Sequence, residues 1–205
     1  MYPPRQLAAY YEETYAHALA SDGEGGVVVA WVTSAWGVGE PKLKAQAFDA
    51  AGQPRSEAVV IQGGGAAASL HVVAGGGRFL VGWSQVPPNG GVELRVFSLA
   101  GERLGTPRLP QATGHRDRFL TDLVAAPQGA LAVWKTSRGD LFAAGWEWDW
   151  ERTTRSLPLT ADRKGDQLFG RVATNGNGDW AAAWKEVSAS PDLLVTNEAR
   201  MFSDP

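Results

Sequence analysis

Apolar and polar positions recur along this chain in blocks of about 50 residues. Four times an apolar run ends in tryptophan, at residues 27–31, 79–83, 131–134 and 180–184. The last residue of each run is Trp31, Trp83, Trp134 or Trp184, and successive tryptophans are 52, 51 and 50 residues apart. A fixed period of this length is typical of propellers and other repeat architectures.

Each of the first three blocks predicts four short strands, and the fourth predicts three. A shorter apolar segment and a Gly-containing turn precede each tryptophan, as in residues 72–74 and 75–77, which indicates a β-hairpin. A polar loop and a third strand follow, and the third strand has an aromatic residue near its end: Phe48, Phe97, Trp146 and Phe202. Such a sheet cannot bury both faces alone and stacks on its neighbours. The chain is therefore predicted to be all-β, a four-bladed β-propeller of four-stranded antiparallel blades.

The predicted blades cover about residues 13–62, 66–111, 118–161 and 166–205 of a single domain, residues 1–205. The fourth block ends after its third strand. Pro4–Leu7 is similar to the starts of the outer strands at residues 54–55 and 107–109. We therefore expect residues 2–9 to join the fourth blade as its outer strand, because this closes the ring and removes an exposed sheet edge.

Two alternatives to this closure remain open. Leu7, Tyr11, Tyr15 and Ala18 fall at helical spacing, which favours a helix over residues 5–20 and would leave the fourth blade with three strands. Two chains could also exchange terminal strands and form an eight-bladed ring, so a homodimer is an alternative assembly.

The apolar strand ending in tryptophan, followed by turns such as Phe48-Asp49-Ala50-Ala51-Gly52, resembles the tryptophan-containing propeller repeats of bacterial extracellular and surface proteins. The resemblance covers nearly the whole chain, implies the propeller fold and favours an extracellular or cell-surface setting. In blade number the chain also resembles the hemopexin domain, but it lacks the cysteines of that family's disulfide. A shared fold does not carry a function with it.

Composition narrows the classes of partner. The formal net charge is -3 and no cluster of Lys and Arg occurs, so we expect no nucleic-acid partner. No apolar run approaches the roughly 20 residues that cross a bilayer, so we expect no membrane insertion. The N-terminal residues lack the pattern of a signal peptide. The absence of cysteine excludes disulfides and thiolate metal sites.

Polar residues on the first strand of successive blades are the first candidate site. His17, His71 and Asp122 each lie three residues before an alanine that ends the predicted strand. Innermost propeller strands line the central channel, so these side chains are candidates to bind an ion or a small ligand there. Channel-lining polar residues bridged by water are the alternative.

Two further segments carry candidate ligands. The turn at residues 175–179 places Asn175, Asn177 and Asp179 at alternate positions, as calcium loops do, but it lacks the further bidentate carboxylate. We therefore expect no cofactor, with Ca²⁺ as the alternative. Exposed aromatic residues suit sugar stacking or protein docking, and the candidates are Trp36, Trp146, Trp148 and Trp150.

No local catalytic motif joins these candidates. The sequence therefore predicts a non-enzymatic binding module whose rim and Trp-rich third blade contact a protein or glycan partner. A structural subunit that assembles through its aromatic edge is the alternative. An enzyme that uses His17, His71 and Asp122 in the channel, with or without a metal, is the third reading.

Overall fold

In the computed structural model, the described residues are 12–35, 40–63, 67–85, 91–107, 118–149, 156–160, 165–175, 177, 179–188 and 195–202. They form strands and turns, and no helix occurs among them. Within these ranges no helix is long and apolar enough to span a membrane. The residues predicted to close the ring, 2–9, lie outside the described ranges, so the predicted closure by an N-terminal strand stays a prediction.

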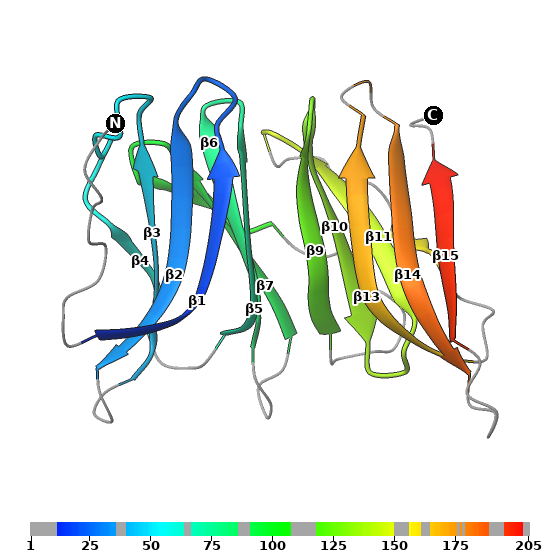
Figure 1. Ribbon diagram of the computed structural model, residues 1–205. Coiled ribbons are helices and arrows are strands. Elements are labelled where there is room, and N and C mark those ends of the chain that lie inside the picture. The colour runs from blue at the N-terminus through cyan, green and yellow to red at the C-terminus, as the bar shows by residue number, and fades with distance from the viewer. Residues whose placement is uncertain are drawn as a thin grey trace. The chain divides into compact units, whose positions relative to one another are not determined.

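Four antiparallel sheets follow the four sequence blocks (Figure 1). The first contains β1 (Glu12–Ser21), β2 (Val27–Ala35), β3 (Lys42–Phe48) and β4 (Val59–Gly63), in that order. The second contains β5 (Ala67–Gly75), β6 (Arg78–Gln85), β7 (Gly91–Ser98) and β8 (Arg103–Gly105). Each sheet is thus built from strands that are consecutive in the sequence.

The third and fourth sheets have the same order. The third contains β9 (Arg118–Ala126), β10 (Gly129–Thr136), β11 (Leu141–Glu147) and β12 (Leu157–Pro158). The fourth contains β13 (Gly165–Thr174), β14 (Trp180–Ser188) and β15 (Val195–Phe202). The first strand of each sheet (β1, β5, β9 or β13) is called its inner strand below.

The helix considered for residues 5–20 is wrong over residues 12–20, which belong to β1. β1 pairs with β2 in antiparallel register, with Ala18 opposite Ala30 and His17 opposite Trp31. Its alanines at positions 16, 18 and 20 pack against the core, whereas His17 and Leu19 are exposed. Alternate burial is the period of a strand, and it outweighs the helical spacing of the aromatic residues.

The chain divides into two compact units, residues 1–89 with 93–107 and residues 90–92 with 108–205. The first unit holds the first two sheets, apart from the first residues of β7, and the second unit holds the last two. Each unit has its own apolar core. Sheets one and two share a cluster that includes Val28, Ala45, Val72, Phe79 and Trp83. Sheets three and four share a cluster that includes Leu131, Val133, Leu141, Val172 and Trp184.

The four repeat tryptophans are core residues, since none is more than 3% exposed. Large aromatic side chains bury more apolar area than other residues do, and this area stabilises the packing of neighbouring sheets. Gly129 shows how tightly the strands approach one another. A Cβ atom there would overlap the carbonyl oxygen of Trp146 on β11, so only glycine fits at this register position.

Candidate functional site

The two ends of each sheet are built differently. At one end, called the turn end, tight turns connect β1 to β2 and β3 to β4. The opposite end, called the loop end, holds the start of each inner strand and, in the third sheet, the β10–β11 turn at residues 137–140. Loops on a rigid scaffold carry function more often than tight turns do, so the loop end and the inner strands are where a site is expected.

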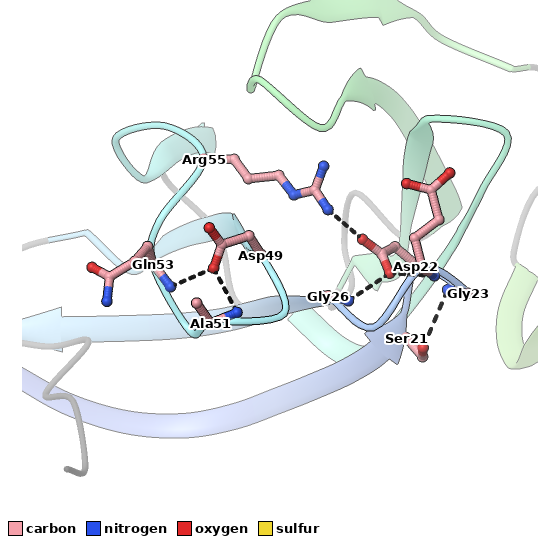
Figure 2. Close-up of polar contacts among 9 residues, drawn as sticks. Ser21, Asp22, Gly23, Gly26, Asp49, Ala51, Gln53 and Arg55 are labelled. Atoms are coloured by element: carbon pink, nitrogen blue, oxygen red, sulfur yellow. Dashed lines mark hydrogen bonds and ion pairs between the residues drawn. The ribbon is translucent and has the colours of Figure 1, made fainter. Parts of the chain in front are cut away.

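At the turn end of the first sheet, Asp22 organises the β1–β2 turn (Figure 2). Its side chain is 2% exposed. Oδ1 accepts hydrogen bonds from the backbone N–H groups of Glu24 and Gly26, both at 2.8 Å, and Oδ2 pairs with the Arg55 guanidinium at 2.8 Å. A Cβ at Gly26 would lie 2.4 Å from Oδ2 of Asp22, so glycine is required beside this carboxylate.

A second aspartate closes the β3–β4 turn in the same sheet. Oδ1 of Asp49 accepts from the N–H groups of Ala51 and Gln53 at 2.9 and 2.8 Å, as Figure 2 shows. Ser98 stands at the matching position in the second sheet, where its hydroxyl accepts from the N–H of Glu102. The carboxylates of Asp22 and Asp49 thus accept hydrogen bonds from backbone groups of their own turns. This end of the sheet has a structural role.

The inner strands of the first unit carry the two predicted histidines. His17 is exposed on β1 and His71 is half-buried on β5, opposite Gly82 of β6. β1 and β5 are neighbouring strands that contact each other along the first unit. The structure thus places both imidazoles on adjacent inner strands of one unit.

Asp122, the third predicted channel residue, lies half-buried on β9 in the second unit. Its Oδ2 accepts a hydrogen bond from the N–H of Val172 on β13 at 2.9 Å, and its Oδ1 accepts from its neighbour Leu123. A bulge in the β9–β10 register lies beside it, between the pairs formed by Val133 and Trp134. The bulge re-aims the side chains of β9, as bulges commonly do near functional sites.

Two more hydrogen bonds join β9 to β13. Nη1 of Arg171 donates to the carbonyl of Thr121 at 2.9 Å, and the hydroxyl of Thr174 donates to the carbonyl of Ala125 at 3.1 Å. Arg171 is exposed, so its remaining guanidinium donors face solvent. Asp122 and Arg171 therefore place one carboxylate and one cation on adjacent inner strands. Sequence analysis singled out the first and missed the second.

The structure describes two of the four tryptophans that were predicted to be exposed, and it places these two differently. Trp146 on β11 is 4% exposed and belongs to the core, whereas Trp148 is half-buried in the turn that follows β11, where its backbone N–H donates to the carbonyl of Gln128. β11 ends at Glu147, so Trp148 follows the strand instead of belonging to it. Trp36 and Trp150 lie outside the described residues.

In the predicted calcium turn the polar side chains bond to each other. Oδ1 of Asn175 accepts from the N–H of Asn177 at 2.8 Å, and Nδ2 of Asn175 donates to Oδ2 of Asp179 at 2.9 Å. An amide donor thus occupies the carboxylate oxygen that a cation would need. Among the described residues, no group of three or more His, Asp or Glu side chains is placed to hold a metal ion.

Further acidic residues that sequence analysis missed stand at the start of inner strands. Glu12 and Glu13 begin β1, and Asp166 is the second residue of β13. The available signal was positional, because each lies a few residues before the apolar part of an inner strand. The competing helical spacing over residues 5–20 obscured where β1 begins.

Two solved structures share this fold. An α-L-arabinanase of Penicillium chrysogenum, solved with arabinobiose, aligns with a TM-score of 0.53 and 10% identity over 94% of this chain. A neuraminidase-like protein from A/bat/Guatemala/164/2009 aligns with a TM-score of 0.54 and 9% identity over 90% of this chain. The chain spans 63% of the first structure and 53% of the second. No protein-family model matches the sequence, and neither does any curated protein.

These findings confirm the predicted fold class: the chain is an all-β propeller with four antiparallel blades. They also correct two predictions. The non-enzymatic binding module, with an assembly subunit as its alternative, and the prediction that the chain is not an enzyme are wrong. The fold is shared with an α-L-arabinanase, which is an enzyme. The error has a physical cause, because a propeller can gather its reacting groups from separate strands, with no local motif.

Carbohydrate-related proteins among the structures of this fold agree with the predicted glycan partner. The comparisons give no support to a protein partner or a homodimer.

Proposed function

We propose that this chain is an enzyme that cleaves glycosidic bonds in a carbohydrate substrate. The observation that carries the proposal is the fold likeness to an α-L-arabinanase solved with arabinobiose, which extends over 94% of this chain. At 10% identity the likeness concerns the fold, so substrate and chemistry here are proposals.

The inner strands support this proposal through their chemistry. Most glycoside hydrolases use a pair of carboxyl groups that flank the scissile bond, one as acid and the other as base or nucleophile. Asp122 is the inner-strand carboxylate whose side chain the structure describes, and it is half-buried beside a bulge. Its hydrogen bonds from two backbone N–H groups hold the carboxylate in one orientation, which suits a base or nucleophile. We assign it that role in the proposal.

A cationic group on the inner strands of the second unit would bind the substrate. Arg171, on the strand next to Asp122, keeps guanidinium donors for sugar hydroxyl or carboxylate oxygens. In the proposal Arg171 orients the sugar.

The test is hydrolysis by the full chain. The purified protein is incubated with arabinan, arabino-oligosaccharides and a sialylated oligosaccharide, and the release of sugar is followed. We expect hydrolysis of at least one substrate, and we expect Asp122→Asn to lower kcat by about 100-fold or more, the usual contribution of a positioned acid–base group.

The matched control is Asp149→Asn, which changes an exposed carboxylate in the turn after β11. It is expected to leave kcat unchanged. Circular dichroism and Tm of both variants separate loss of activity from loss of fold. Absence of hydrolysis on every substrate would overturn the proposed function, and full activity of a folded Asp122→Asn variant would overturn the role of Asp122.

A further inference from the structure

A buried amide group at the loop end of the second unit has no hydrogen-bond partner among the residues that the structure describes. Gln167 on β13 has an exposed fraction of 0%. Neither its side-chain nitrogen Nε2 nor its oxygen Oε1 forms a hydrogen bond with the described residues. Buried polar groups in folded proteins are almost always paired, with protein groups or with ordered water, because an unpaired one is costly.

The position of Gln167 is defined by its neighbours on two sheets. Its backbone N–H lies 3.4 Å from the carbonyl oxygen of Gly139, which belongs to the β10–β11 turn of the third sheet. Within the fourth sheet it stands directly opposite Glu186 on β14. Residues directly opposite each other in an antiparallel pair extend their side chains from the same face. The amide and the Glu186 carboxylate therefore lie together.

That shared face points toward the third sheet. Trp184 is two residues from Glu186 on β14, so both lie on one face, and Trp184 packs in the core with Val133 and Leu141 of the third sheet. Oε2 of Glu186 is buried as well. An amide and a carboxylate oxygen thus face the third sheet at the loop end of the interface between the two sheets.

The donors and acceptors of this cluster decide which ligand fits. Gln167 presents an NH₂ group, which only donates, and a carbonyl oxygen, which only accepts. A cation would bind the oxygen atoms and leave the NH₂ group unpaired. A small neutral molecule that both donates and accepts satisfies the whole group. Water has this property, and full burial of the side chain leaves no access for a larger hydroxyl compound.

We propose that Gln167 and Glu186 hold a bound water molecule between the third and fourth sheets. The water accepts from Nε2 or donates to Oε1 of Gln167, and it donates to the Glu186 carboxylate or to the second lone pair of the Gly139 carbonyl. Buried waters have two to four such partners. By linking β13 to the β10–β11 turn, the water fixes this turn at the loop end of the third sheet, and the proposal does not depend on the enzymatic activity.

The direct test is NMR on the folded full chain. Cross-relaxation between a long-lived water and the side-chain NH₂ of Gln167 is expected. Absence of this signal while the Gln167 amide resonances are resolved would overturn the proposal.

The second test replaces the amide by an apolar side chain of similar shape. Gln167→Met removes the partners of the water, and a fall in Tm of about 2–4 °C is expected. Gln128→Met is the matched control, since Gln128 is exposed in the β9–β10 turn, and it should leave Tm unchanged. An unchanged or higher Tm for Gln167→Met means that the amide was unpaired, and this contradicts the proposal. NaCl and CaCl₂ test for a bound cation, with choline chloride as the control. If NaCl or CaCl₂ raises the Tm of the unsubstituted protein, and the rise is absent with choline chloride and absent from Gln167→Met, the site binds a cation and the proposal of a bound water is overturned.

Discussion

The two units use their most fully bonded aspartates for different purposes. In the first unit, Asp22 joins two turns of a single sheet through the N–H of Gly26 and the guanidinium of Arg55. In the second unit, Asp122 joins two sheets, because its Oδ2 accepts from the N–H of Val172 on the neighbouring inner strand.

The contacts between inner strands differ accordingly. β1 and β5 meet in the first core, to which β1 contributes the alanines at positions 16, 18 and 20 and β5 contributes Val72 and Ala74. β9 and β13 also share a core, and three hydrogen bonds from Asp122, Arg171 and Thr174 are added to it. Apolar packing fills space without fixing direction, whereas hydrogen bonds specify register and orientation. The second unit therefore has the more precisely positioned inner strands, and it also carries the proposed reacting carboxylate.

The largest effect is expected from Asp22→Ala. The change leaves the buried N–H of Gly26 without its acceptor and removes the partner of Arg55, so the free energy of unfolding should fall by about 2–3 kcal/mol. Asp22→Asn keeps an oxygen for the turn and should cost less. Urea unfolding measures both variants, and equal losses would show that the ion pair, rather than the turn, accounts for the stabilisation.

A smaller loss, about 2 kcal/mol, is expected from Val72→Ala in the apolar contact of the first unit, because two buried methyl groups are lost and a cavity remains. Val172→Ala is the matched change on β13, where the valine is buried to the same degree and its backbone N–H still reaches Asp122. Unfolding curves should show that Val72→Ala costs at least as much as Val172→Ala. A clearly greater loss for Val172→Ala would contradict this difference between the two units.

The smallest effect on stability is expected from Asp122→Ala, at about 1–2 kcal/mol, because the carboxylate is only half-buried and the N–H groups of Val172 and Leu123 lose this acceptor without being fully buried. The expected signature is local: amide hydrogen exchange should quicken at Val172 more than at Val72. Uniformly faster exchange in both units would contradict a specific role of Asp122 at the contact between β9 and β13.

Sequence reasoning identified the strands well and the site only in part. The period of the tryptophans located all four sheets, since each of Trp31, Trp83, Trp134 and Trp184 must be buried. The alignment of the predicted inner strands indicated Asp122, together with His17 and His71. Sequence reasoning missed Arg171, because the bulge between Leu168 and Arg171 shifts the register of β13 and no local pattern announces a bulge. It also expected a binding module, since it searched for a contiguous motif.

What the sequence by itself determined is the repeat: an apolar strand of period two that ends in tryptophan, preceded by a glycine turn, specifies a four-blade all-β chain through short-range propensities and burial. The tertiary structure alone decided which polar side chains meet. Asp122 and Val172 are 50 residues apart in sequence, and Gln167 reaches Gly139 only across two sheets. Such contacts depend on register and on the stacking of sheets, which the order of residues along a single strand does not encode.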